Sequence, residues 1–204
     1  MTGGTPATYP LVLRGELDKP IHRWLFLVKW LLLLPHLIML ALLSIALAVS
    51  LVICFFAILF TASYPRGLFG FNVGVLRWWW RVSFYGYAAL GTDRYPPFSL
   101  DSDPVYPADL TMEYSQQLNR WLVLVKWLLA VPHLLVVTIF NGGYGKWGGG
   151  LVWLLTVIAG FANLFAGEYP ETIFRLVMGL NRWSFRVAAY TLLMTDKYPP
   201  FSLD

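Results

Sequence analysis

The chain has 204 residues, of which 58% are hydrophobic and 13% are charged, and its formal net charge is +4. Soluble domains carry about 25% charged residues, so this composition excludes an ordinary soluble domain and indicates an integral membrane protein. The ten Trp, eleven Tyr and fourteen Phe residues fit the same class, because aromatic side chains gather at membrane interfaces.

The first predicted element is a short strand that precedes an apolar run. Leu11, Leu13 and Leu17 alternate with polar or small residues, and Leu110 and Met112 show the same alternation later in the chain. A period of two is typical of strands. We therefore expect a small cytoplasmic β element, joined by the Phe-Ser-Leu-Asp tails that close each half of the chain.

The next element is an apolar run over residues 24–62. As a single helix its 39 residues would extend roughly 58 Å, about twice the ~30 Å thickness of a hydrocarbon core. We therefore predict a transmembrane hairpin over residues 24–62 that turns near residues 44–50. Residues 1–20 lack the pattern of a removable signal peptide, so the first spanning helix is expected to act as the insertion signal.

A third segment, residues 68–90, combines apolar residues at helical spacing with basic ones. Arg77 and Arg81 would lie near the bilayer centre if this segment crossed the membrane, at a cost of about 2.5–3.5 kcal/mol each. A helix that lies in the interface avoids this cost. We therefore predict an in-plane amphipathic helix.

The chain is a tandem duplication. Residues 23–37 and 120–134 are identical at twelve of fifteen positions, at an offset of 97. The closing segments 93–101 and 196–204 differ at one position. Both ends of the unit are thus repeated, and two units of about 100 residues follow.

The two membrane repeats are predicted to cover residues 1–104 and 105–204. The second repeat is expected to contain a helical hairpin over 121–166 and an interfacial helix over 173–194. The offset between the copies grows from 97 to 105, which places an insertion in the glycine-rich stretch 141–150, between the two arms of the hairpin.

The predicted topology has two spans per repeat. Residues 151–166 are slightly short for a span, so this segment either crosses fully or is re-entrant. With two spans per repeat, fourteen of the fifteen Lys and Arg residues lie on one side and Lys146 alone on the other. The positive-inside rule then makes both termini cytoplasmic, and the even span count makes the copies a parallel repeat about an axis along the membrane normal.

Each first apolar helix carries a lysine and a Pro-His pair. Lys29 and His36 are seven residues apart, as are Lys126 and His133, so each pair shares one helix face. The histidines lie about 18 Å into their helices, near the bilayer centre, where an ionisable side chain is a candidate functional group. These four residues form the candidate intramembrane polar site.

Two interpretations are open for each of these residue types. The histidines either relay protons along a polar path or donate a hydrogen bond to a carbonyl that Pro35 or Pro132 leaves free. The lysines either line the path or snorkel to cytoplasmic headgroups. We favour the structural interpretation for the histidines and snorkelling for the lysines.

Basic residues beside tryptophans form a second candidate site. Arginine forks next to interfacial aromatic side chains suit anionic phospholipid headgroups. The alternative is ordinary anchoring on the positive side together with salt bridges. The candidate headgroup-binding residues are Arg77, Arg81, Arg175, Arg182, Arg186, Trp78 and Trp183.

The repeated motifs resemble a known family. The Pro-His pair within the first apolar helix and the Tyr-Pro-Pro-Phe-Ser-Leu closure are similar to those of the DUF4389 family of bacterial polytopic membrane proteins, over nearly the whole chain. The resemblance implies a bacterial inner membrane and supplies no activity. It is carried by Arg23, Pro35, His36, Tyr95, Pro96 and Pro97 and by their equivalents Arg120, Pro132, His133, Tyr198, Pro199 and Pro200.

The expected fold class is therefore an all-α, multi-pass inner-membrane protein with a small β element. We expect a non-enzymatic lipid-interacting scaffold or accessory subunit, with anionic lipids and a protein partner or second copy as its partners, and no nucleic acid. A channel or proton-coupled transporter using His36 and His133 is the alternative, and a membrane enzyme acting on lipids is the third hypothesis. No catalytic residue, cofactor or metal site is expected, since no phosphate-binding, nucleophile-elbow or metalloprotease motif occurs.

Overall fold

A computed structural model describes residues 9–142 and 149–203 of the chain. The mostly helical composition and the two short strands agree with the sequence analysis. In chain order the elements are β1 (Leu11–Gly15), the 3₁₀ turn η1 (Leu25–Leu27), α1 (Lys29–Leu32), α2 (Leu34–Thr61), α3 (Arg66–Tyr85), β2 (Ala108–Met112), α4 (Leu122–Asn141), α5 (Leu151–Ala166) and α6 (Glu171–Thr191).

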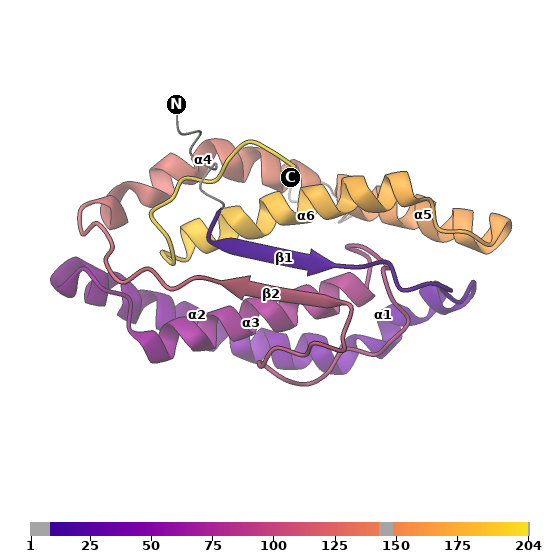
Figure 1. The fold of residues 1–204 in the computed structure, drawn as a ribbon, viewed down its shortest axis with the longest axis horizontal. Coiled ribbons are helices and arrows are strands. Elements are labelled where there is room, and N and C mark those ends of the chain that lie inside the picture. The colour runs from indigo at the N-terminus through magenta and orange to yellow at the C-terminus, as the bar shows by residue number, and fades with distance from the viewer. Residues whose placement is uncertain (1–8, 143–148, 204) are drawn as a thin grey trace, which may run out of the picture.

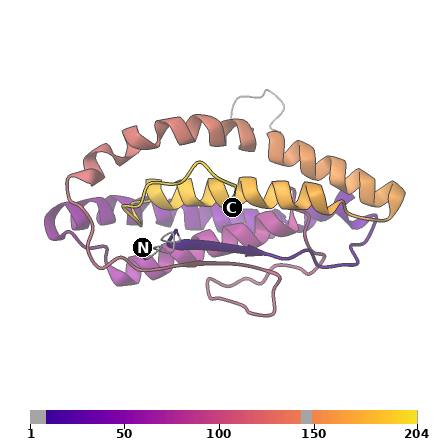
Figure 2. The ribbon, with the colours of Figure 1, turned by 45° about the horizontal axis from the view of Figure 1, so that its top comes forward.

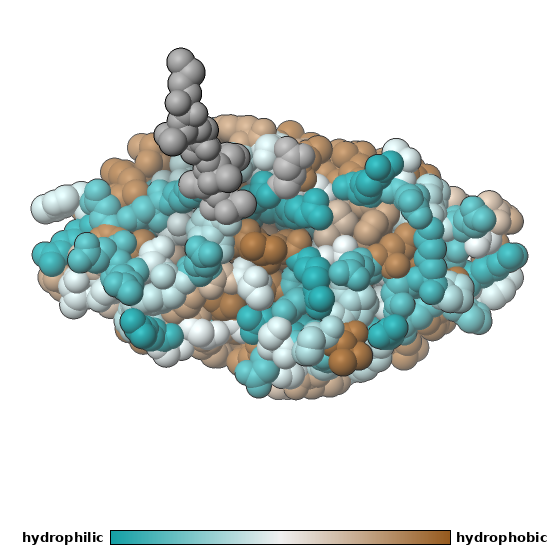
Figure 3. Space-filling model, viewed as in Figure 1, coloured by the Kyte–Doolittle hydropathy of each residue, from teal (hydrophilic) through white to brown (hydrophobic). Residues whose placement is uncertain are grey.

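The elements form three layers whose long axes run in nearly the same direction. Figures 1 and 2 together show β1 and β2 in front, α3 and α6 behind them, and α2, α4 and α5 at the back. In agreement, α3 contacts β2 and α2, whereas α6 contacts β1, α4 and α5. The face that carries the strands is mostly hydrophilic (Figure 3). The molecule is thus a slab with a polar front, an amphipathic middle and an apolar back.

The sheet joins the two repeats. β1 from the first repeat pairs antiparallel with β2 from the second, and the register sets Leu13 opposite Leu110. These two leucines are equivalent at the offset of 97, so a pseudo-twofold axis passes between them, through the sheet. The strand prediction is thus confirmed, and each strand packs on the middle-layer helix of the other repeat.

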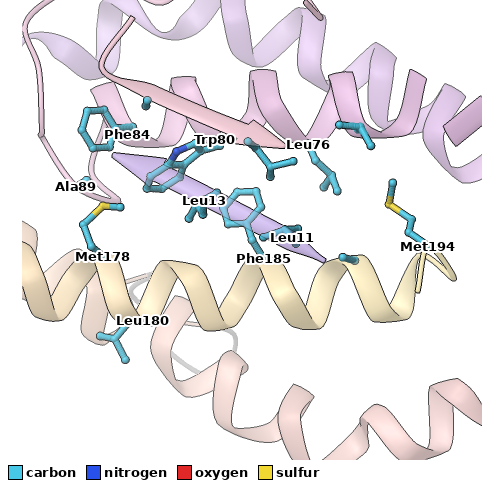
Figure 4. Packing of buried hydrophobic residues seen from close by; sticks show 14 of the residues in the cluster. Leu11, Leu13, Leu76, Trp80, Phe84, Ala89, Met178, Leu180, Phe185 and Met194 are labelled. Atoms are coloured by element: carbon cyan, nitrogen blue, oxygen red, sulfur yellow. The ribbon is translucent and has the colours of Figure 1, made fainter. Parts of the chain in front are cut away.

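The core lies between the sheet and the middle helices. Figure 4 shows Trp80 of α3 and Phe185 of α6 close together beside Leu13. Their ring centroids are 5.5 Å apart in an edge-to-face arrangement, and the two positions are equivalent at the offset of 105. Such pairs add about 0.5–1.5 kcal/mol to the burial of the rings. Equivalent aromatic residues of the two repeats therefore meet near the pseudo-twofold axis.

The predicted hairpin over residues 24–62 is wrong. α2 runs without interruption through residues 44–50, where the turn was expected. These residues contain neither glycine nor proline, and the Ser44 hydroxyl donates to the Leu40 carbonyl within the helix. Because residues 44–50 contain no helix-breaking residue and α3 packs against α2, the apolar run stays helical from Leu34 to Thr61.

The predicted hairpin over residues 121–166 is also wrong. Figures 1 and 2 show α4 and α5 following one another along a single arch above α6, instead of folding back on each other. The backbones of Gly142 and Gly150 lie so close that a Cβ on Gly142 would fall 2.5 Å from the Gly150 nitrogen. The ends of α4 and α5 therefore approach each other at Gly142 and Gly150, within one arch. Residues 143–148, which include Lys146, lie outside the described part.

The predicted interfacial helices over 68–90 and 173–194 are present as α3 and α6. They are amphipathic, but both lie between the sheet and the apolar helices, and about half of their residues are buried. The arginines of the first copy consequently face protein groups. The sequence pattern identified an amphipathic helix correctly, although it could not distinguish a lipid interface from a protein interior.

The Phe-Ser-Leu-Asp tails do not extend the sheet. Within the described residues the sheet has two strands, and each tail instead lies against a glycine of the middle layer. A Cβ on Gly74 would fall 2.8 Å from Leu100, and one on Gly179 would fall 2.8 Å from Leu203. The absence of a side chain at these two positions permits the close approach.

Two described helices, α2 and α4, are long and apolar enough to cross a membrane. α5 is apolar but has only sixteen residues. The length and composition of these two helices therefore agree with a membrane protein.

Candidate functional site

Lys29 is fully buried and bound on three sides. Its Nζ lies 2.9 Å from Asp93 Oδ1 and donates to the Thr92 carbonyl at 2.6 Å. It also lies 4.6 Å from the ring centroid of Tyr85. A buried ammonium requires this kind of compensation, since its uncompensated burial costs several kcal/mol.

Lys126 repeats this arrangement in the second repeat. Its Nζ lies 2.7 Å from Asp196 Oδ1, donates to the Thr195 carbonyl at 2.8 Å and lies 5.4 Å from the Tyr190 ring centroid. Both lysines therefore point inward, as the shared helix face predicted. The snorkelling interpretation is wrong, because each ammonium is tied to the aspartate that opens the closing segment of its own repeat.

His36, seven residues after Lys29, lies in an aromatic pocket. Its Nδ1 accepts a hydrogen bond of 3.0 Å from Trp78 Nε1. The Phe98 ring stacks on the imidazole with a centroid distance of 3.9 Å, and Tyr95 lies 4.9 Å away. The Tyr-Pro-Pro-Phe segment thus closes over the histidine.

His133 has the equivalent partners. Trp183 Nε1 donates to its Nδ1 at 3.0 Å, Phe201 stacks on it at 3.9 Å, and Tyr198 lies at 4.8 Å. The two histidine pockets are therefore built in the same way, one within each repeat. Among the described residues, no hydrogen bond, ion pair or ring contact joins His36 to His133.

A tyrosine of each closing segment donates to a helix carbonyl three residues before the proline. The Tyr95 hydroxyl donates to the Leu32 carbonyl at 3.0 Å, and the Tyr198 hydroxyl donates to the Leu129 carbonyl at 3.1 Å. The structural interpretation gave each histidine the donor role at the carbonyl freed by the proline, whereas Nδ1 of each histidine is an acceptor. The histidines instead accept from tryptophan, and the tyrosines of the closing segments donate to the interrupted helices.

The Trp78–His36 hydrogen bond leads to a direct test. We expect Trp78→Phe to destabilise the protein by about 1–3 kcal/mol, because it leaves Nδ1 of a buried imidazole without a donor. Trp183→Phe should act in the same way on His133. Denaturant unfolding in detergent, followed by circular dichroism, measures both. No effect from either variant would show that these bonds contribute nothing to folding.

Arg77 and Arg81 are directed into the protein. Both lie near Asp109 Oδ1, at 3.1 and 3.3 Å respectively. Arg77 Nη1 also donates to the Leu100 carbonyl, and Arg81 Nη2 donates to the Asp101 carbonyl, each at 2.7 Å. Burial lowers the pKa of Arg81, and the Asp109 carboxylate opposes this shift. These arginines connect the first repeat to β2 and are not placed to bind headgroups.

The remaining members of the headgroup set are spread over different environments. Trp78 is buried, and Trp183 forms part of the His133 pocket. Arg186 is half-buried and lies 5.9 Å from the Tyr9 ring centroid. Arg182 is half-buried and Arg175 is exposed. The structure therefore does not gather the set into one surface.

The sequence analysis did not assign the acidic partners of the lysines or of Arg77 and Arg81. Asp93 and Asp196 hold the lysines, and Asp109 holds two arginines. The repeated closing segment did contain a signal for the first two, since it conserves an aspartate between the copies. Asp109 has Val12 as its equivalent, so no internal comparison could identify it.

Several tyrosines outside the apolar helices are buried, which leads to a prediction about alkaline pH. Burial raises the pKa of Tyr64, Tyr106 and Tyr169 above the ordinary value of 10.0, and that of Tyr85 to about 12. Because the pKa values of these tyrosines are raised in the folded state, their contribution to the free energy of unfolding is complete below pH ~10. It is lost as the pH rises through the folded-state pKa values. We expect the tyrosinate absorbance of these four residues, assigned by Tyr→Phe variants, to appear together with loss of helical circular dichroism. Tyrosinate absorbance of these four residues that precedes unfolding would contradict this.

A groove of about 290 Å³ separates the apolar helices of the two repeats. Its walls include Leu37 of α2 and Trp153 of α5, and Trp79 of α3 contributes to its lining. Ser83 and Asn141 are polar residues at the same groove. The volume is at the lower end of ligand pockets, which begin near 300 Å³.

Comparison with known proteins supports the resemblance. The model of the family described as "Domain of unknown function (DUF4389)" matches twice, over residues 23–99 and 120–202. The two matches support the tandem repeat, whose boundary at residues 104 and 105 stays a prediction. No curated protein and no solved structure matches the chain. Because the two matches cover most of the sequence, the chain belongs to the DUF4389 family.

Proposed function

We propose that this protein is a non-enzymatic, lipid-interacting scaffold or accessory subunit of the bacterial inner membrane, with both termini cytoplasmic. The observation that carries the proposal is the apolar outer layer of α2, α4 and α5, which no described part of the chain covers. Large hydrophobic side chains are exposed along all three helices. They include Ile38, Leu42, Ile45, Phe60, Trp127, Leu135, Ile139, Leu154 and Phe165.

The charge distribution supports lipid as the contact of this layer. α2 and α5 contain no Asp, Glu, Lys or Arg, and the only such residue of α4 is Lys126, which is buried. An exposed surface of this size is unusual for a protein in water. The groove between the repeats opens among the same helices and could hold an acyl chain.

Vesicle flotation of a matched pair of variants tests this proposal. Ile45 and Val12 are 64% and 59% exposed, on the apolar layer and on β1 respectively. We expect Ile45→Asp to weaken partition into vesicles roughly a hundredfold, because a charged residue in the hydrocarbon costs about 2.5–3.5 kcal/mol. Val12→Asp should leave it unchanged. Equal behaviour of the two variants would overturn the proposal.

The preference for anionic headgroups has its own test. Arg175 is the exposed member of the predicted headgroup set. We expect Arg175→Gln to weaken binding about fivefold to vesicles that contain anionic lipid, since a basic residue near such a surface contributes about 1 kcal/mol. Binding to zwitterionic vesicles should not change. A loss on both vesicle types would indicate damage to the fold instead.

Proton transport is the second candidate, and one observation favours it. Nε2 of His36 and Nε2 of His133 are buried, and each faces a backbone group of its closing segment, Pro96 or Pro199, without a hydrogen bond of normal geometry among the described residues. A proton path would use these nitrogens. Proton flux in proteoliposomes separates the candidates. Flux that disappears in His36→Ala/His133→Ala protein would support transport, and a flux equal to that of empty liposomes would remove it.

A further inference from the structure

We infer that the protein lies in one leaflet: its apolar helices run parallel to the membrane plane, its sheet faces the cytoplasm, and no described segment crosses the bilayer. The inference rests on the proposed lipid contact of α2, α4 and α5. It replaces the multi-pass topology expected from the sequence. Four features of the structure support it.

The first is the direction of the sheet. Figures 1 and 2 show β1 and β2 running along the same direction as the helices. If the helices crossed the bilayer, the strands would cross it beside them. Within the described residues the sheet has two strands, so each strand has an unpaired edge, and Val12, Arg14 and Thr111 are exposed. Open sheet edges do not occur in lipid, because their backbone groups would lack partners.

The second is the connection between the repeats. α3 ends at one end of the slab and α4 begins at the other, and residues 86–121 return the chain between them with only β2 as regular structure (Figure 1). Crossing helices would force this segment through the hydrocarbon. Arg94 and Asp101 on it are exposed. Helices in the membrane plane leave the whole segment in water.

The third is the pseudo-twofold axis. It passes between Leu13 and Leu110, through the sheet, and therefore across the three layers. The first helices of the two repeats consequently begin at opposite ends of the slab. Crossing helices would place Arg23 and Arg120 on opposite sides of the membrane, against the positive-inside rule. With helices in the plane, the axis lies along the membrane normal and both arginines lie at one depth.

The fourth is the thickness of the apolar layer and the position of its exposed tryptophans. The layer is one helix thick, about 10 Å, whereas one leaflet contributes about 15 Å of hydrocarbon. In-plane helices are typically buried about 5–10 Å deep. Trp24, Trp30, Trp121 and Trp127 are exposed near the starts of the first apolar helices, where they suit the headgroup level. These tryptophans favour lipid over a second protein copy as the partner of the layer.

Depth measurements along α2 test the inference. Leu37, Val49 and Phe60 are exposed positions on this helix. Leu37 and Phe60 are separated by about 35 Å, roughly the thickness of the hydrocarbon core. Each position is changed to Cys in a Cys54→Ala background, spin-labelled and reconstituted. Oxygen and a water-soluble relaxation agent then report the depth of each label. Val12→Cys on β1 is the matched control.

We expect similar depths within one leaflet for all three α2 labels, and a fully water-exposed label at position 12. A profile that is deepest at position 49 and shallow at 37 and 60 would show a crossing helix and overturn the inference, while leaving the lipid contact intact. Water exposure of all labels would overturn both the inference and the proposed function. Labels shielded from both agents and coupled between molecules would identify a second copy as the partner and also overturn it.

Oriented circular dichroism of the unmodified protein in aligned bilayers gives the same answer without substitutions. The helices should show the spectrum of in-plane orientation. A transmembrane spectrum would overturn the inference even if the cysteine variants failed to fold.

Discussion

Asp93→Asn is expected to destabilise the protein by about 3 kcal/mol, because it leaves the fully buried ammonium of Lys29 without its carboxylate. Breaking a buried pair on one side typically costs about 3–5 kcal/mol. We expect the lower end, since the Asp93 side chain is 24% exposed and Lys29 keeps the Thr92 carbonyl and the Tyr85 ring. Denaturant unfolding in detergent measures the change.

The matched controls separate charge burial from loss of packing. Lys29→Met/Asp93→Asn removes both charges and should recover stability to within about 1 kcal/mol of the wild type. Glu171→Gln breaks the exposed pair with Lys19 and should have no measurable effect. A double variant as unstable as Asp93→Asn would show that the aspartate acts through its other contacts and not through the lysine.

Trp80→Ala is expected to cost about 3–5 kcal/mol, the range for removing a large aromatic side chain from a core. Trp80 is fully buried and contacts Phe84 and Phe185, and its Nε1 donates to the Arg14 carbonyl of β1 at 2.8 Å. The substitution therefore opens a cavity between the repeats and leaves a carbonyl of β1 without its donor. Thermal unfolding in detergent should show the loss.

The adjacent residue supplies the control. Trp79 lies on the same helix and is 45% exposed, so Trp79→Ala should change stability far less. Trp80→Phe is expected to fall between the two, because it keeps most of the ring contact and loses the hydrogen bond. Similar losses for Trp79→Ala and Trp80→Ala would mean that helix propensity, and not the contact between the repeats, determines the effect.

Much of the fold follows from patterns that can be read locally. The alternation at Leu11 and Leu13 identified β1, and the amphipathic pattern around Arg77 identified α3. The spacing of Lys29 and His36 predicted one inward face. These features succeed because periodicity reports which side of an element is buried.

The hairpins failed because they rested on the length of the apolar run and not on a residue that ends a helix. A run of 39 apolar residues exceeds a membrane only if it stands upright, and nothing between residues 44 and 50 breaks a helix. The prediction that Arg77 and Arg81 bind lipid headgroups failed because it also rested on local sequence alone. An arginine beside an apolar stripe has the same local sequence whether its partner is a phosphate or the Asp109 carboxylate.

The sequence by itself determined the duplication, the apolar composition expected of a membrane protein and the inward face shared by each lysine and histidine. Only the tertiary structure decided the partners of these residues. Lys29 meets Thr92 and Asp93 more than 60 residues later in the chain, and β1 of one repeat packs on α6 of the other. The physical reason is that a local pattern reflects whether a side chain is buried or exposed. A contact between distant residues depends in addition on how the elements that carry them pack together in the folded chain.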